Sequence, residues 1–146
     1  MTKKPRPKHT NATETCPSCE EKLKTAHPEL QEWFNTVVKP KHRDAHISWA
    51  WRGKEDQEKA FLDGATKLHF PLSPHNKTDD QGNPCSLALD LFELDYNSIA
   101  RWAWGYFRDI AKEAQQSKFK IRWGGDFKTL GDSNHYSIEL DESKQS

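Results

Sequence analysis

Residues 118–140 read KFKIRWGGDFKTLGDSNHYSIEL. Apolar and polar side chains alternate near both ends of this segment, with Phe119, Ile121 and Trp123 in its first part and Tyr136, Ile138 and Leu140 in its last. A period of two is typical of strands that have one buried and one exposed face. The segment therefore predicts two strands, and with them a sheet.

Helices are predicted at three places upstream of this segment. Apolar residues recur at helical spacing between Pro28, which suits a first helical turn, and Pro40, where we expect the helix to end. The same periodicity over residues 99–110 predicts a second amphipathic helix. Residues 54–63 are highly charged and predict a short surface helix with Gly64 as its stop.

Two further strands complete the predicted sheet. Residues 45–51 and 86–94 both alternate, and residues 71–85 between them hold three prolines and a glycine, which indicates a loop. Because helices and strands are mixed rather than regularly alternating, the predicted class is α+β. We expect a single domain with a small, mainly antiparallel sheet flanked by helices.

Composition limits the number of domains and the partners. The 146 residues fit one domain, and 22 basic against 22 acidic residues give a formal net charge of zero, unlike the basic excess of a nucleic-acid-binding protein. Only 34% of the residues are hydrophobic, but six Trp, seven Phe and three Tyr add large apolar surfaces. No segment approaches the roughly 18 apolar residues of a membrane span. We expect a monomer that binds neither nucleic acid nor membrane.

The ends of the chain are polar. We expect residues 1–27 to form an N-terminal arm that carries a C-x-x-C motif, residues 28–140 to form the folded domain, and residues 141–146 to form a tail. The basic N-terminus has no apolar stretch behind it, so we predict cytoplasmic synthesis without a signal peptide.

The cysteines allow two interpretations. Cys16 and Cys19 have the spacing of half a structural zinc site, which Cys85 or His27 would have to complete. We favour a reduced pair near solvent, because three cysteines do not suggest a disulfide framework. The alternative is a zinc-knuckle adaptor built around Cys16 and Cys19.

Two of the seven histidines differ from the rest by their neighbours. His75 lies in the polar loop before a predicted strand in which Asp90 is a single acid among apolar residues, and His135 begins the last strand. A buried carboxylate is costly unless it is paired or binds a cation. Two imidazoles and one carboxylate with an open fourth position are the ligands of a catalytic zinc. The spacing of these residues does not by itself establish a metal site. His46, which alternates with apolar residues in a predicted strand, could lie close to the same site.

Three blocks of sequence carry a resemblance to a known family. They are, in chain order, ISWAWRG at 47–53 with Gln57 behind it, SPH at 73–75 with SLALD at 86–90, and RWGGDF at 122–127 with DSNHY at 132–136. The third block is the most specific. Together they resemble the M15 family of zinc peptidases, which includes D-Ala-D-Ala carboxypeptidases and phage L-alanyl-D-glutamate endolysins.

The resemblance implies an open zinc site with one Zn²⁺ per chain, held by His75, Asp90 and His135. Asp132 would be the general base that activates the attacking water. The family places six residues between its His and Asp ligands, whereas fourteen lie between His75 and Asp90. This insertion keeps the neighbouring acids at 79–80 as rivals to Asp90, which we prefer because a strand fixes its carboxylate.

The resemblance also implies a substrate side of the site. Arg52 would hold the substrate carbonyl or carboxylate and the developing oxyanion, and Ser73 and Gln57 would support substrate binding. The alternative for Arg52 is a surface ion pair with Glu55 or Asp56. We expect the tryptophans at 49, 51, 102 and 104 in the core rather than in a sugar-stacking platform.

The implied function is a zinc metallopeptidase that hydrolyses peptidoglycan stem peptides. It would be an L-alanyl-D-glutamate endopeptidase or a D-Ala-D-Ala carboxypeptidase, which use the same residues. We expect a phage-type lysin that acts at the cell wall or from a virion. The alternative is a non-catalytic cell-wall or zinc-binding module on the same scaffold.

Overall fold

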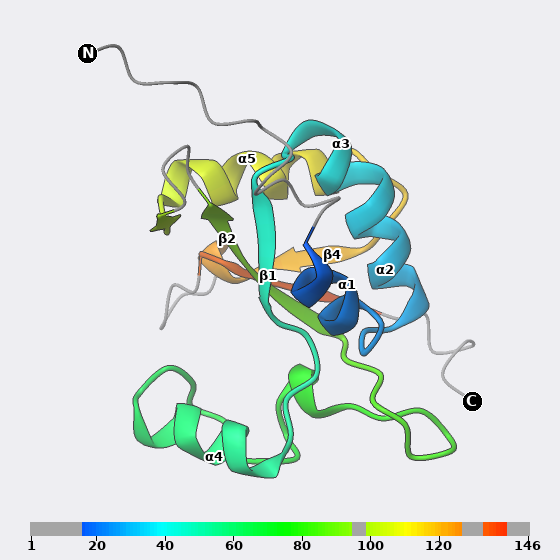
Figure 1. Cartoon of the computed structure of the whole chain (residues 1–146), viewed down its shortest axis with the longest axis vertical. Helices are drawn as coiled ribbons and strands as arrows, with labels where there is room; N and C mark the ends of the chain where they lie inside the picture. Colours follow the sequence, from blue (N-terminus) through cyan, green and yellow to red (C-terminus); the bar gives the residue numbers. More distant parts are fainter. Residues whose placement is uncertain (1–15, 95–98, 127–132, 140–146) are drawn as a thin grey trace.

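A five-stranded antiparallel sheet lies at the centre of the computed structural model, which describes residues 16–94, 99–126 and 133–139 (Figure 1). Its main path runs β1 (Ala45–Trp49), β2 (Ala88–Leu94), β5 (His135–Ile138) and β4 (Ile121–Trp123), and β3 (Ala100–Arg101) pairs with the end of β2. Every pairing is antiparallel. The predicted α+β class and all four predicted strands are confirmed.

Within the described residues, five α-helices lie around the sheet or beyond its ends. They are α1 (Pro17–Leu23), α2 (Pro28–Trp33), α3 (Lys39–Lys41), α4 (Lys54–Leu62) and α5 (Trp104–Gln115). Figure 1 shows α4 beyond the ends of β1 and β2, away from the sheet, whereas the other helices lie close to it. None of these helices has the length and apolar character that crossing a membrane requires.

Helix α1 lies in the segment that we predicted to be a polar arm. Pro17 is its first residue, and Cys19 and Leu23, four residues apart on one face, are both buried in the core. Cys16 and Cys19 form a disulfide, where the sequence favoured a reduced pair. The packed part of the chain therefore begins ahead of residue 28.

The helix that begins at Pro28 continues past its predicted stop. A π-helical turn, Phe34–Val38, follows α2 directly and leads into α3, which contains Pro40. The helical segment ends at Lys41, one residue past the predicted stop, because a wider turn just before a proline accommodates a residue that has no N–H to donate. The predicted apolar face is confirmed, since Leu30, Trp33 and Val38 are fully buried.

Helix α5 begins later than the predicted 99–110. Its buried residues, Phe107, Ile110, Ala111 and Ala114, follow the helical period from the second turn onward. Ile99 and Trp102, which we counted in the helix, are 60% and 55% exposed and precede it. The two-residue strand β3 takes the place of the first turn of the predicted helix.

The tryptophan prediction is wrong at three of its four positions. Trp49, Trp102 and Trp104 are exposed, and Trp51 is half-buried. An irregularity in the β1–β2 register between Ile47 and Trp49 breaks the alternation that would have buried Trp49. The core is instead closed by other aromatic residues, among them Trp33 and Tyr136, whose ring centres are 5.4 Å apart.

Candidate metal centre

Paired strands bring an acid and an imidazole together at the middle of the sheet. Asp90 on β2 lies directly opposite His135 on β5 in the antiparallel register. Their side chains point to the same side, and Asp90 Oδ1 lies 2.9 Å from His135 Nδ1. The alternating patterns that predicted the two strands therefore also set this pair.

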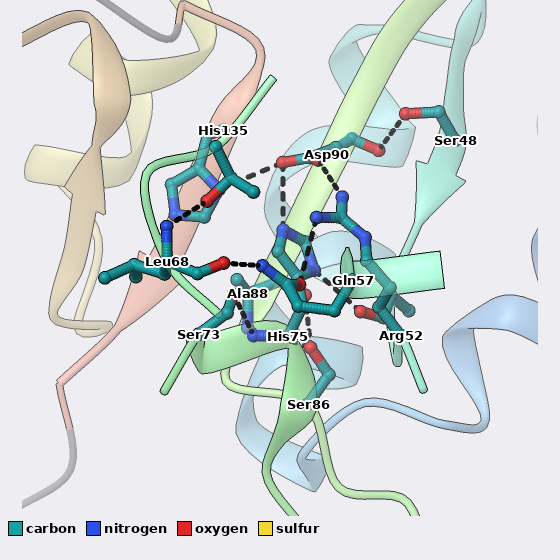
Figure 2. A network of polar contacts seen from close by, with 12 residues as sticks. Ser48, Arg52, Gln57, Leu68, Ser73, His75, Ser86, Ala88, Asp90 and His135 are labelled. Carbon is teal, nitrogen blue, oxygen red and sulfur yellow. Dashed lines mark hydrogen bonds and ion pairs between the residues drawn. The ribbon is translucent and has the colours of Figure 1, made fainter. Parts of the chain in front are cut away.

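A short capped turn brings the second imidazole to the same point. His75 lies in a 3₁₀ turn, Pro74–Asn76, whose first N–H groups are capped by the Ser73 hydroxyl, which accepts from the His75 amide at 3.2 Å. Nε2 of His75 is 3.2 Å from Asp90 Oδ1. Figure 2 shows the His75 ring below the Asp90 carboxylate, with His135 to one side.

The hydrogen bond on the other side of the His75 ring fixes its tautomer. Nδ1 lies 2.7 Å from the carbonyl oxygen of Ala50, so Nδ1 must carry the proton and donate it. In the neutral ring Nε2 then presents a lone pair to a carboxylate oxygen, a contact that is favourable only with a cation or a proton between them. A metal ion between Nε2 and the carboxylate would satisfy both groups. A backbone carbonyl that holds the other ring nitrogen, as Ala50 does here, is typical of a histidine that binds metal.

The electrostatics favour the ligating form of the acid. All three residues are at least 92% buried, and their candidate ligand atoms lie within 4.8 Å of one another. Burial by itself raises the pKa of Asp90, but positive charge on protonated His75 and His135 rings, with their hydrogen bonds, outweighs burial and holds the pKa below its ordinary value. A metal cation held between neutral rings and the carboxylate would act in the same direction. Two ring nitrogens and an ionised carboxylate fit a zinc ion with one coordination position open.

The rival acids lie elsewhere. Asp79 and Asp80 are exposed in the inserted loop, which is closed by a bridge between Thr78 and Pro84. The Asp79 carboxylate accepts from two backbone amides of its own turn, and these hydrogen bonds lower its pKa. Asp79 therefore stabilises the loop, and the acid that meets the two histidines is Asp90.

Arg52 is buried against the metal-ligand cluster. Its Nη2 is 3.2 Å from Asp90 Oδ2, its guanidinium lies 4.8 Å from the centre of the Trp49 ring, and the residue is 6% exposed. The alternative of a surface ion pair with a neighbouring acid is therefore wrong. Within the described residues, Nε of Arg52 is buried and has no hydrogen-bond partner.

An amide network holds Arg52 in place. Gln57 Oε1 accepts from Arg52 Nη1 and from Asn76 Nδ2, each at 3.2 Å, and Gln57 Nε2 donates to the Leu68 carbonyl at 2.7 Å. Asn76 also donates to the Arg52 carbonyl at 2.8 Å. The structure thus places the Gln57 amide between Leu68 and Arg52, fully buried and engaged at both ends, and Gln57 does not line the neighbouring cavity (Figure 2).

Sequence reasoning missed Asn76. Its Oδ1 accepts from the Ser73 amide at 3.0 Å, which completes a capping box around the turn that carries His75. The spacing of Ser73 and Asn76, three residues apart ahead of a strand, was the available signal. The carbonyls of Ala50 and Leu68 left no signal, because any residue type supplies a carbonyl.

A cavity of about 610 Å³ opens beside the ligands. The predicted site residues that line it are Arg52, Ser73, His75, Asp90 and His135, while Gln57 does not. Other lining residues are Trp49, Lys67, Leu68, Trp102, Arg122 and Asn134. The three candidate ligands therefore face a space that can admit a peptide-sized group.

The Trp-Gly-Gly block fixes the start of β5. Trp123 Nε1 donates to the Ser133 carbonyl at 2.6 Å, and a Cβ on Gly125 would overlap the Trp123 ring. Gly124 and Gly125 form a 3₁₀ turn rather than a strand bulge. Asp132, the predicted general base, lies outside the described residues.

Comparison with solved structures relates this fold to that of a known enzyme. The crystal structure of the L-Ala D-Glu endopeptidase ChiX from Serratia marcescens matches with a TM-score of 0.64 and 22% sequence identity. The match covers 84% of this chain and 87% of that chain. No protein-family model matches the chain, and no curated protein sequence does. At this level of identity, the likeness shows that the two chains share a fold.

Proposed function

We propose that this protein is a zinc metallopeptidase that hydrolyses peptidoglycan stem peptides between L-Ala and D-Glu. One observation carries the proposal: His75, Asp90 and His135 converge beside an open cavity, with Nε2 of His75 left as an acceptor facing the carboxylate. The fold shared with an L-Ala D-Glu endopeptidase supports the substrate class. The zinc class rests on the donor set.

The chain's own groups would hold and orient the metal ligands. Ala50 fixes the tautomer of His75 through its carbonyl, and Arg52 holds the second oxygen of Asp90. A zinc ion bound there would supply a nucleophilic water at neutral pH and would polarise the scissile carbonyl. Ser73 acts through His75, since its hydroxyl caps the turn that carries this ring.

Arg52 is the proposed anion holder on the substrate side. Its guanidinium has five N–H donors, of which one contacts Asp90 and one contacts Gln57. The remaining donors and the position of Arg52 on the cavity wall suit a substrate carbonyl or carboxylate. We assign proton transfer to Asp132, which precedes His135 by three residues in the sequence.

The charges on the cavity wall favour an acidic peptide. Among the lining residues, Arg52 and Asp90 form an ion pair with each other, and Lys67 and Arg122 add positive charge beyond that pair. Arg122 also lies 3.7 Å from Glu139. Cations around a cavity attract anionic ligands. A stem peptide carries a free carboxylate on its D-Glu residue and so fits this wall. We further propose that the protein acts at the cell wall, as a lysin.

Digestion of purified cell walls tests this function. Zinc-loaded protein should release fragments with a new D-Glu amino terminus, identified by mass spectrometry of the muropeptides. Release of terminal D-Ala instead would assign a carboxypeptidase, and cell-wall binding with no new products would assign a non-catalytic module. Protein treated with a chelator serves as the control and should release nothing.

A further inference from the structure

A second cluster of metal-binding side chains lies where α1 meets β1. Cys16 caps the start of α1, Cys19 is in its first turn, and His46 is the second residue of β1. Their ligand atoms lie within 4.8 Å of one another, and Cys19 Sγ is 3.3 Å from His46 Nδ1. The third donor is thus a histidine 27 residues downstream, neither Cys85 nor His27.

The backbone around the two sulfurs suits thiolates. The amide of Cys19 donates to Cys16 Sγ at 3.1 Å, and the amide of Ile47 donates to Cys19 Sγ at 3.5 Å. Each sulfur thus already has a backbone N–H donor, which a metal-bound thiolate can also accept. Thiolates combined with an imidazole are the donors that Zn²⁺ takes in structural sites.

His27, one of the two residues that the sequence suggested for completing the cluster, already caps another helix. His27 caps α2, with Nδ1 accepting from the Glu29 amide at 3.1 Å. Cys19 and His46 are 3% and 4% exposed, Cys16 is half-buried, and a cavity of about 410 Å³ borders Cys19. The cluster supplies three of the four donors of a tetrahedral site, and a water would supply the fourth.

We propose that Cys16, Cys19 and His46, when the cysteines are reduced, bind a zinc ion that ties α1 to β1. In the structure the two sulfurs form a disulfide. A dithiol reductant opens this bond with two electrons and two protons and becomes a disulfide itself. Zinc binding then releases both thiol protons to solvent. The same residues thus hold α1 in place by a disulfide or by a metal.

The site has a structural consequence for the candidate metal centre. Lys22 Nζ donates to the Ile47 carbonyl at 3.2 Å, and Thr25 Oγ1 accepts from the Trp51 amide at 3.1 Å. Both contacts join the α1 region to the strand that leads to Ala50, whose carbonyl orients His75. A zinc ion at the cluster would strengthen this junction.

Cobalt titration of the reduced full-length protein tests the proposal. Thiolate-bound Co²⁺ gives a charge-transfer band in the near ultraviolet, and the cluster of His75, Asp90 and His135 contains no sulfur, so it cannot give this band. Reduced wild-type protein should show the band, and Zn²⁺ should displace it. Absence of the band in reduced protein would overturn the proposal.

Substitutions locate the signal. Cys16→Ser should abolish the band, and Cys85→Ser, the matched control at the third cysteine, should keep it. His46→Gln should weaken Co²⁺ binding by more than the roughly 10–100-fold that loss of an outer-shell partner costs. A band that survives Cys16→Ser, or affinity that is unchanged in His46→Gln, would place the metal elsewhere and contradict the proposal.

Thermal unfolding gives a second measurement. Zinc should raise the melting temperature of reduced Cys85→Ser more than that of reduced Cys16→Ser, because metal bound to the native state stabilises it. Cys16 is half-buried, so Cys16→Ser should fold. Equal zinc-dependent increments in the two variants would overturn the tie between α1 and β1.

Discussion

The described structure holds two clusters of metal-binding side chains that differ in donor chemistry and in surroundings. The cluster of His75, Asp90 and His135 offers nitrogen and carboxylate oxygen beside a cavity with an arginine on its wall. The other cluster offers two sulfurs and one nitrogen between a helix and a strand. Each set supplies three donors to a zinc ion. The first lies beside a cavity that a substrate can enter, whereas the second joins a helix to a strand, where a zinc ion would stabilise the fold.

The two clusters also differ in what positions them. Paired strands and a capped turn fix the first cluster, and a hydrogen-bond network around Gln57 and Asn76 fixes the arginine beside it. The second cluster depends on a seven-residue helix held by a few contacts to β1. A reactive site needs the more rigid support, since misplaced ligands cost activity directly.

Loss of a ligand from the first cluster should have the largest effect. His135→Ala should empty the zinc site of oxidised protein and reduce cell-wall hydrolysis to background, because a buried ligand is missing and Asp90 loses a partner. Metal analysis and a turbidity assay on cell walls measure both. Cys16→Ser, which cannot form the disulfide and lacks one donor of the second cluster, should retain about one zinc per chain at the first. Zinc that stays in His135→Ala would reverse the roles of the two clusters.

Changing the proposed base should separate metal binding from proton transfer. Asp132→Asn should keep its zinc and its melting temperature, while kcat falls by roughly two to four decades, the usual contribution of a positioned base. Asp90→Asn should instead lose zinc, because an anionic ligand becomes neutral. If Asp132→Asn lost its zinc and Asp90→Asn kept it, Asp132 would be the ligand and Asp90 the base.

The guanidinium geometry of Arg52 should matter more than its charge. Arg52→Lys should lower kcat/KM roughly tenfold or more, about 1.4 kcal/mol per decade, because an ammonium cannot contact Asp90, Gln57 and a substrate oxygen together. Arg108→Lys on the surface of α5 is the matched control. Equal kcat/KM values for Arg52→Lys and wild type would return Arg52 to a purely structural role.

The smallest effect on activity is expected where the Trp-Gly-Gly block supports β5. Gly125→Ala should destabilise the protein by about 1–3 kcal/mol, because its Cβ would overlap the Trp123 ring, and should lower kcat/KM less than roughly threefold. Gly105→Ala in α5 is the control, since nothing lies within 4 Å of a Cβ there. It should be neutral or stabilising by up to about 1 kcal/mol. Urea unfolding of both variants compares them.

The strands could be predicted from the sequence because each has one buried face, and that face sets a period of two. The same alternation indicated Asp90 as an unusual acid, and pairing with His135 followed from the antiparallel register. Helix positions were less accurate. The short β3 before α5 depends on its pairing with β2, which a local pattern does not contain.

The support around the site could not be predicted in the same way. The resemblance implied that Gln57 supports substrate binding, and only the fold brings its amide against Arg52 and Asn76 instead. The joining of Cys19 to His46 requires knowing that α1 packs on β1. The exposure of Trp49 depends on a register irregularity of one strand pair. Each of these features arises from contacts between segments that are distant in the sequence.

Anomalous diffraction at the zinc edge, on crystals of oxidised zinc-loaded protein, tests the central claim most directly. The account predicts one strong peak within about 2.0–2.2 Å of a ligand atom from each of His75, Asp90 and His135. A peak at Asp79 or Asp80, or a peak at His46 with none at His75, would contradict it.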